Sequence, residues 1–221
     1  MMPVVKSFVR PDGRCFVRDP DAESLAAVTH DVYCSVDESQ MEPYLALGFA
    51  VHRREGEYLV PTVAKGERPD GISFRRADEI DEGTLRTLDN ELRQDVPGTD
   101  GWRWDVSGFH EETYESPHFD PATYLVAVDD AAREAVGIVR VWMRPNEPKL
   151  GFIGVTAAYR RRGIALALLA AVFAELRARG VDEVTTTIDE ANIASRALLE
   201  GLGARRTGTS VELLRSWSSR T

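Results

Sequence analysis

Three consecutive arginines followed by small residues form the part of this sequence best suited to chemistry. The segment reads Arg160-Arg161-Arg162-Gly163-Ile164-Ala165, between a strand-like stretch and a helix-like one. The first N–H groups of a helix have no partner inside the helix and lie at the positive end of its dipole. Small residues let a diphosphate approach that backbone closely, and arginines add the charge that compact anions favour. The segment therefore predicts an anion cradle, with a solvated basic turn as the alternative.

Other nucleotide-binding motifs fit the sequence less well. A Gly-x-x-x-x-Gly-Lys-Ser/Thr loop does not occur. Gly151 and Gly154 lie inside a predicted strand and not in a Gly-x-Gly-x-x-Gly turn. The candidate chemistry is therefore that of the arginine segment.

The elements that must position the cradle follow from hydrophobic periodicity. A helix is predicted over 163–179, because its apolar residues fall on one stripe and Gly180 stands where a C-terminal cap belongs. The other elements predicted for this part are strands at 72–76, 124–128, 136–143, 149–155 and 184–188, helices at 81–95 and 192–201, and a closing strand or hairpin at 204–215. The polar and aromatic stretch 101–120 is predicted to be a loop-plus-helix lid outside the core.

The first sixty residues predict a smaller set of elements. A hairpin over 7–17 turns at Pro11-Asp12-Gly13, and a short helix starts at Asp19-Pro20. The remaining elements of this set are a strand at 32–36, a helix at 38–47 and a second hairpin at 49–61, which turns near Glu55-Gly56. Prolines, glycines and mixed charge then mark a linker. The predicted domains are 1–62, a linker at 63–71, and 72–221.

An internal repeat relates the two parts of the chain. Residues 32–38 and 184–190 share a strand pattern that ends in Asp-Glu, and each copy continues into a short helix, a Leu-Gly pair and basic residues. The helix of the first copy is about three residues shorter by this alignment. The first sixty residues therefore read as a truncated relative of the C-terminal half.

Composition narrows the class of protein. The chain has 221 residues, 43% hydrophobic and 29% charged, with 27 Lys and Arg against 36 Asp and Glu and a net charge of −9. Such a surface repels phosphate backbones, so neither nucleic acid nor a membrane surface is an expected partner, whereas a cationic amine suits it. Two cysteines are too few for a disulfide framework or a structural zinc site. Without a signal peptide or an apolar run of about 18 residues, a cytoplasmic location is expected.

The context of the cradle resembles a known superfamily. Its residues are Leu150-Gly-Phe-Ile-Gly-Val155, Tyr159-Arg-Arg-Arg-Gly-Ile-Ala165 and Asp189-Glu-Ala-Asn192-Ile-Ala-Ser195-Arg-Ala-Leu-Leu199-Glu-Gly-Leu-Gly203. This stretch resembles the GNAT (Gcn5-related N-acetyltransferase) superfamily, and the order of elements matches over about residues 72–215. The resemblance implies an α/β (α+β) fold with a mixed, mostly antiparallel central sheet flanked by helices. The preceding partial repeat is similar to tandem GNAT proteins such as mycothiol synthase.

The resemblance also implies a set of cofactor-binding residues. Ile153, Gly154 and Val155 would line the splayed end of the central strand and offer backbone groups to the pantetheine arm. The pyrophosphate would be surrounded by Arg160, Arg161, Arg162, Gly163, Ile164, Ala165 and Leu166. Asn192 and Ser195 would contact the cofactor arm, although Asn192 is also a favourable helix cap.

Catalysis is where the sequence departs from the family. Acyl transfer needs a neutral amine, a stabilised oxyanion and a proton for the thiolate. Leu199 stands where many GNATs have a tyrosine, and Lys149 where a glutamate often serves as base. Either positioning and oxyanion donors near Val155 carry the reaction, or the site binds acyl-CoA without turnover, or other groups substitute. The substitutes are Glu147, Asp189 or Glu190 as base and Ser195 or Tyr159 near the sulfur.

The expected function is an N-acyltransferase that moves an acetyl group from acetyl-CoA to a primary amine by direct attack in a ternary complex. No metal is expected. The acceptor is a small molecule or a peptide, with the aromatic set 102–114 and Glu111 and Glu112 as its candidate wall. The alternative is a non-catalytic acyl-CoA sensor or interaction protein. The oligomeric state is expected to be monomer or homodimer.

Overall fold

A computed structural model describes residues 6–63 and 65–217, which form two compact units. The first unit contains the residues up to Glu57, residues Ile188–Ala191 and those from Arg206 onward. The second contains Tyr58–Thr187 and Asn192–Arg205. These units are defined by contacts, and they divide the chain differently from the predicted domains 1–62 and 72–221. The assignment of those domains to family units stays a prediction.

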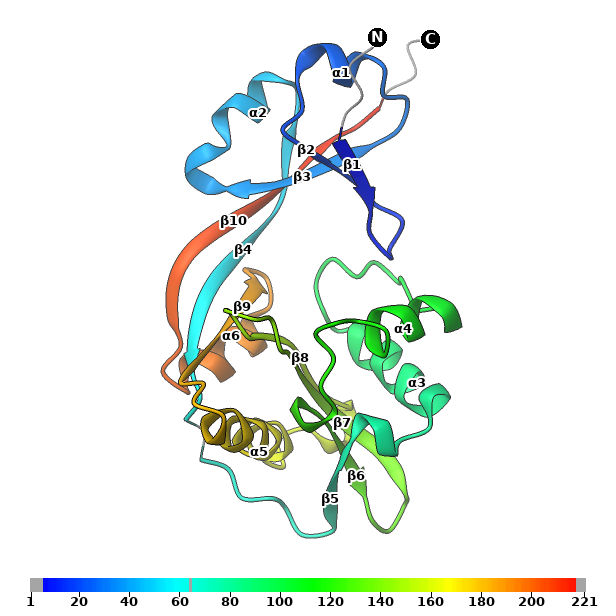
Figure 1. The fold of residues 1–221 in the computed structure, drawn as a ribbon, viewed down its shortest axis with the longest axis vertical. Coiled ribbons are helices and arrows are strands. Elements are labelled where there is room, and N and C mark those ends of the chain that lie inside the picture. Colours follow the sequence, from blue (N-terminus) through cyan, green and yellow to red (C-terminus); the bar gives the residue numbers. More distant parts are fainter. Residues whose placement is uncertain (1–5, 64, 218–221) are drawn as a thin grey trace. The chain divides into compact units, whose positions relative to one another are not determined.

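The strands are labelled in Figure 1. In the described residues the strand order is β1-β2-β3-β10-β4-β9-β8-β7-β6-β5. Five neighbouring pairs are antiparallel, and β2–β3 and β8–β9 are parallel. The predicted mixed, mostly antiparallel sheet flanked by helices is therefore confirmed. The strands are β1 (Lys6–Val9), β2 (Cys15–Arg18), β3 (Val32–Asp37), β4 (Ala50–Pro61), β5 (Ile72–Arg76), β6 (Tyr124–Asp129), β7 (Glu134–Trp142), β8 (Lys149–Val155), β9 (Glu183–Asp189) and β10 (Arg205–Arg215).

The helices agree with most of the predicted ones. They are α1 (Ala22–Ala26), α2 (Glu42–Ala46), α3 (Glu82–Arg93), α4 (Val106–Thr113), α5 (Ile164–Ala178) and α6 (Ile193–Glu200), with 3₁₀ turns at 38–40, 77–79, 121–123 and 157–159. The helix predicted over 38–47 is instead a 3₁₀ turn followed by α2. Pro43, which has no N–H to donate, stands in the first turn of α2, where that loss costs nothing. None of the helices in the described part of the chain is long and apolar enough to cross a membrane.

The first unit confirms one predicted hairpin and corrects the other. β1 pairs with β2 through a turn at Pro11–Gly13, where Gly13 has φ +81°. The hairpin predicted at 49–61 is wrong, because β4 is one continuous strand. Gly56, which the sequence suggested as a turn residue, is a buried residue within this strand.

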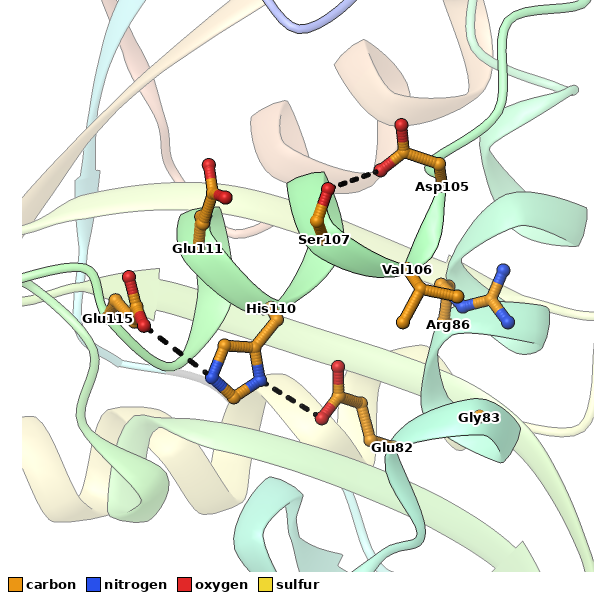
Figure 2. A pocket seen from close by; sticks show the side chains of 9 residues that line it. All are labelled: Glu82, Gly83, Arg86, Asp105, Val106, Ser107, His110, Glu111 and Glu115. Carbon is orange, nitrogen blue, oxygen red and sulfur yellow. Dashed lines mark hydrogen bonds and ion pairs between the residues drawn. The ribbon is translucent and has the colours of Figure 1, made fainter.

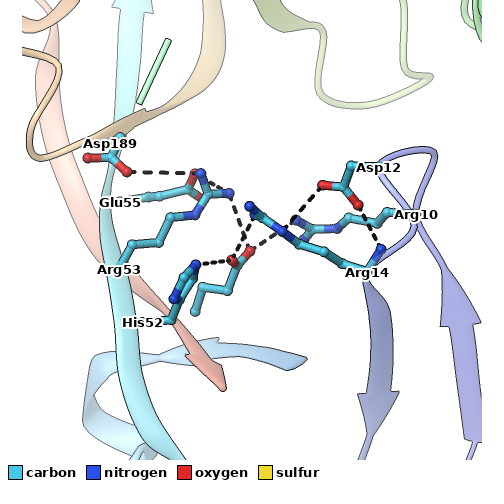
Figure 3. A network of polar contacts seen from close by, with 8 residues as sticks. Arg10, Asp12, Arg14, His52, Arg53, Glu55 and Asp189 are labelled. Atoms are coloured by element: carbon cyan, nitrogen blue, oxygen red, sulfur yellow. Dashed lines mark hydrogen bonds and ion pairs between the residues drawn. The ribbon is translucent and has the colours of Figure 1, made fainter. Parts of the chain in front are cut away.

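A buried carboxylate ties the elements of the first unit together. Glu212 on β10 has a side chain that is 2% exposed. It accepts hydrogen bonds from Arg10 Nη1 at 3.0 Å and Arg53 Nη2 at 3.3 Å, and Arg14 Nη1 lies 3.6 Å away. Figure 3 shows these side chains converging from the β1–β2 hairpin and from β4. The network thus joins three separate segments through one charge.

The internal repeat has a structural counterpart. β3 leads through α2 to β4, and β9 leads through α6 to β10. The helix of the first copy, α2, has five residues and α6 has eight, which is the expected difference of three. Gly48 and Gly203 follow the two helices with φ +86° and +85°.

In the second unit, helices α3 and α5 pack on opposite faces of the strands (Figure 1). A side chain built at Gly154 of β8 would meet Leu92 of α3 at 3.2 Å. One built at Gly137, the partner of Val155, would meet Leu168 of α5 at 3.5 Å. Neighbouring residues of β8 therefore face different helices, as a strand's period of two requires.

The stretch predicted to be a lid contributes to the core. Trp104 is 9% exposed and Phe109 fully buried, and both pack in one cluster with Leu88, Tyr124 and Phe152. The prediction that this stretch lies outside the core is wrong for these two aromatics. Asn90 explains part of the error, because its side chain donates to the Trp104 carbonyl and accepts from the Trp104 N–H at 3.1 and 2.7 Å. The Asn90 side chain thus supplies hydrogen-bond partners to the backbone N–H and C=O of Trp104, which allows this residue to be buried.

Candidate functional site

The central feature of the site is the end of strand β8, where its neighbour β9 diverges. Parallel pairing is registered at Lys149 opposite Thr185, near the start of both strands. One residue further, the Thr186 hydroxyl donates to the Leu150 carbonyl at 2.8 Å. A residue inserted at Gly151 shifts the register with β7. The residues of β8 that follow Leu150 therefore have no β9 residue registered opposite them.

The backbone of Val155 points toward the edge of β8 from which β9 diverges. Thr156 donates its N–H to the Val136 carbonyl on the β7 side at 2.9 Å. Strand residues alternate in direction, so Val155 directs both its N–H and its C=O to the opposite side. The Val155 N–H therefore faces the edge where the sequence analysis expects an oxyanion donor, and that role stays a prediction.

The arginine segment forms the turn into helix α5. Gly163 is the residue before the helix and has φ +80°, with no side-chain cap on the helix start. Arg161 also has a positive φ, +63°. A Cβ built at Gly163 would meet nothing within 4 Å, so the surroundings of this residue at the helix start are open. This geometry suits an anion at the helix start.

A cavity of about 430 Å³ adjoins the end of β8. It brings together seven of the predicted cofactor residues: Ile153, Gly154, Val155, Arg160, Ala165, Asn192 and Ser195. The other predicted residues lie on the same turn but do not line it. Arg161, Arg162 and Gly163 are exposed, and the side chain of Ile164 is buried beneath the helix. Ile164 thus offers only its backbone, while Leu166 lies half-buried two residues further along α5.

A carboxylate and a guanidinium group meet at this cavity. Arg160 donates from Nε to the Val155 carbonyl at 3.0 Å and from Nη2 to the Asp95 carboxylate. Asp95 follows helix α3 and also lines the cavity. Asp95 was not predicted to belong to the site, because its 65-residue separation from Arg160 leaves no local signal in the sequence.

Arg162 and Tyr159 pack away from the cavity lining. The Tyr159 hydroxyl donates to Asp129 at 2.9 Å, and the Arg162 guanidinium lies over the Tyr159 ring. Hydrogen bonds from the Ala132 N–H and then from Tyr159 lower the pKa of Asp129. The Asp129 carboxylate in turn raises the pKa of Tyr159. Tyr159 thus anchors the turn to the β6–β7 connection, and its hydroxyl already has a partner.

Helix α6 supplies the opposite wall of the cavity. Asn192 caps the helix, because its Oδ1 accepts the Ser195 N–H at 3.1 Å. Ser195 is the hydroxyl-bearing side chain among the described lining residues. Leu199, at the position where many GNATs have tyrosine, is 2% exposed, and Leu198 lines the cavity beside it. This wall is therefore apolar except for one amide and one hydroxyl.

The predicted acidic bases do not line the cavity. Glu147 is exposed in the β7–β8 connection. Glu190 accepts a hydrogen bond from Arg206 Nη2 at 2.6 Å and belongs to the first compact unit. Asp189 of the same unit accepts the Ala191 N–H at 2.8 Å. Their catalytic roles stay predictions without a structural contact in their favour.

A second, acid-rich pocket of about 810 Å³ lies between α3 and α4 (Figure 2). His110 joins its two sides, with Nδ1 3.1 Å from Glu82 and Nε2 3.7 Å from Glu115. The hydrogen bond to Glu82 is the main cause that raises the pKa of His110. Glu111 lines this pocket, whereas the predicted acceptor-wall aromatics Trp102 and Trp104 do not. Within the described ranges no group of His, Cys, Asp and Glu side chains is arranged to hold a metal ion.

Known proteins resemble this chain in sequence. The model of the Acetyltransferase (GNAT) family matches residues 86–204, more than half of the chain. Mycothiol acetyltransferase of Salinispora arenicola (strain CNS-205) is 32% identical over 154 residues, which cover 67% of this chain and 49% of that protein. The enzyme of the same name from Thermobispora bispora is 29% identical over 175 residues, 73% of this chain and 58% of that protein. The chain thus spans about half the length of these curated relatives.

Solved structures share the fold at low sequence identity. A GCN5-related N-acetyltransferase from Sphaerobacter thermophilus superposes with a TM-score of 0.75 at 19% identity, covering 97% of this chain and 76% of that one. A tandem GNAT protein from the clavulanic acid biosynthesis pathway superposes with a TM-score of 0.67 at 16% identity, covering 94% and 76%. At these identities the likeness concerns the fold alone.

Proposed function

We propose that this chain, which belongs to the GNAT family of acetyltransferases, transfers an acetyl group from acetyl-CoA to a primary amine by direct attack in a ternary complex. The observation that carries the proposal is the cavity between the end of β8 and helix α6, which opens beside an uncapped helix start. A thioester with a long polar arm and a diphosphate fits such a site, because strand edge and helix start both offer backbone N–H groups.

The diphosphate would bind at the start of α5. Its backbone N–H groups lie at the positive end of a 15-residue helix, and the space at Gly163 is open. Arg161 and Arg162 add charge beside it. The pantetheine arm would follow Ile153–Val155, with Asn192 and Ser195 on the facing wall.

Catalysis in this proposal depends mainly on positioning. The Val155 N–H faces the diverging edge and would stabilise the oxyanion that develops on the thioester carbonyl. Ser195, which lines the cavity, would pass a proton toward the departing sulfur. Because no carboxylate other than Asp95 lines the cavity in the described chain, the amine would arrive neutral or lose its proton to water. Acceptors in scope are small-molecule and peptide amines, and the acidic surface favours both.

A non-catalytic acyl-CoA sensor is the second candidate. The specific observation in its favour is Leu199, a buried apolar side chain where a proton donor is common in the family. Such a protein would bind CoA and release no thiol with any acceptor.

Free-thiol release separates these functions. The full chain is incubated with acetyl-CoA and a panel of amino sugars, diamines, peptides and the amine acceptor of mycothiol acetyltransferases. An enzyme releases thiol with at least one acceptor, whereas the sensor is only stabilised, by about 2.7 kcal/mol at a hundredfold excess of CoA over its Kd. Absence of both effects refutes the acyl-CoA site itself.

Gly163→Glu tests the location of the diphosphate. The substitution adds bulk and negative charge at the helix start, so we expect CoA binding to be lost. The matched control is Gly180→Glu at the other end of α5, about 25 Å away at 1.5 Å per residue. Both glycines have a positive φ, +80° and +78°, and open space around a built Cβ, so both variants carry a similar strain of about 1–2 kcal/mol. Equal CoA affinity in the two variants would place the diphosphate elsewhere.

A further inference from the structure

We propose that Arg160 is a positioning residue, which ties the end of β8 to Asp95, and that it does not grip the diphosphate. The inference rests on the proposed function, because the site that Arg160 would position is the acetyl-CoA site. It concerns the first arginine of a segment in which all three arginines look equivalent in the sequence.

The contacts of Arg160 use both ends of its guanidinium. Nε donates to the Val155 carbonyl at 3.0 Å, and Nη2 pairs with the Asp95 carboxylate. The Val155 carbonyl points to the edge of β8 from which β9 diverges. The Arg160 side chain donates to it there, in place of a backbone N–H of β9. A carbonyl in that place needs a donor, so the bond holds the Val155–Thr156 peptide in one orientation.

The proposed oxyanion donor, the Val155 N–H, belongs to the preceding Gly154–Val155 peptide. The N–H and C=O of one strand residue point to the same side, so the Val155 N–H lies beside the bond to Arg160. A rotation of the strand end that released the carbonyl would also turn this N–H. Arg160 therefore acts on the oxyanion donor through the backbone.

Asp95 connects the arrangement to helix α3. Its N–H donates to the Leu92 carbonyl at 3.3 Å, and Leu92 lies against Gly154. The end of α3 thus meets the end of β8 twice, through an apolar contact at Gly154 and through the Asp95–Arg160 pair. Leu92, Asp95, Gly154, Val155 and Arg160 all line the 430 Å³ cavity, so these contacts set the distance between two of its walls.

The two possible roles of Arg160 predict opposite effects of Asp95→Asn on CoA binding. If Arg160 binds the diphosphate, Asp95 competes for it, and removal of a negative charge tightens CoA binding. If Arg160 positions the strand, Asp95→Asn loosens the wall and weakens CoA binding. We expect a loss of about three- to tenfold, modest because both side chains are about half exposed.

The experiment measures the Kd of CoA by calorimetry for the full chain and four variants. These are Asp95→Asn, Arg160→Gln, the double variant, and Arg161→Gln as a control for loss of charge at the cradle. We expect the two single losses to be similar and the double variant to be no worse than either, which marks one shared contact. A double loss equal to the product of the single losses, or tighter binding by Asp95→Asn, overturns the inference.

A spectroscopic readout removes the ambiguity of a general loss of structure. The Nε–H resonance of Arg160, assigned by its absence in Arg160→Lys, should keep its shift when CoA is added, because its partner is the Val155 carbonyl. A large shift with CoA that pantetheine does not produce means that the diphosphate is the partner, and overturns the inference. If the unmodified chain binds no CoA, the proposed function fails first. If it binds CoA but these outcomes are reversed, only the positioning role fails.

Discussion

The carboxylate of Glu212 offers the sharpest test of what holds the first compact unit together. Its side chain is 2% exposed and lies within 3.0 to 3.6 Å of Arg10, Arg53 and Arg14. Glu212→Gln keeps the shape but leaves three guanidinium groups facing a neutral amide. Removing one partner of a buried ion pair costs about 3–5 kcal/mol.

The lower end of that range applies here. The three arginines are 14–34% exposed, so water can solvate part of the charge that Glu212 now balances. We therefore expect the free energy of unfolding to fall by about 3 kcal/mol, which is a large fraction of the 5–15 kcal/mol typical of a domain. The matched control is Glu55→Gln, which pairs with Arg53 at 3.2 Å but is 24% exposed. Its loss should stay below about 1 kcal/mol.

Urea unfolding followed by two probes measures this difference. Far-UV circular dichroism reports both units, whereas Trp102, Trp104 and Trp142 of the second unit dominate the fluorescence of the chain. We expect Glu212→Gln to lower the dichroism midpoint more than the fluorescence midpoint. If Glu212→Gln and Glu55→Gln have the same free energy of unfolding, the attraction in the buried ion pairs only offsets the cost of desolvating their charges. That result would refute the reasoning.

Three further predictions follow from single contacts. The raised pKa of His110, caused first by its hydrogen bond to Glu82, means that its contribution to stability is complete below the unfolded pKa and is lost as pH rises through the folded value; ring-proton NMR should show a lower His110 pKa in Glu82→Gln, and an unaltered titration would rule the contact out. Burial, then the charge of Glu212, raises the pKa of the Cys34 thiol to about 12, so iodoacetamide at pH 8 should label Cys34 only after unfolding, and rapid labelling of Cys34 in the folded protein would contradict this. Gly66→Ala would place a Cβ 2.6 Å from the backbone of Leu166; we expect a loss of about 1–3 kcal/mol in thermal unfolding, and an unchanged melting temperature would mean that the linker moves aside freely.

Local signals predicted the elements that carry the cofactor cradle. The apolar stripe of α5 and the glycines at both of its ends depend on residues that are close in sequence, so helix and boundaries were accessible. The prediction of a turn near Gly56 was wrong, because a glycine flanked by charges reads as a turn until neighbouring strands cover it. Pairing with those neighbours makes β4 continuous.

The candidate site shows the same limit more clearly. Ile153–Val155, Asn192 and Ser195 were predicted from motif resemblance and do meet at one cavity. Asp95 was missed, because only the folded chain brings it to Arg160. The burial of Trp104 was missed for a related reason, since the Asn90 amide that satisfies its backbone lies on another element. Contacts between distant segments are what the sequence pattern does not contain.

The cap on helix α6 has a consequence for what the cavity accepts. Because Asn192 Oδ1 accepts the Ser195 N–H, the amide keeps both NH₂ hydrogens for a guest and has one acceptor lone pair fewer. The Val155 amide and the first turn of α5 likewise present hydrogens. A molecule complementary to this lining carries oxygen acceptors along its whole length, as amide carbonyls and phosphates do, and Asn192→Asp would keep the helix cap while replacing a donor by a repelling charge.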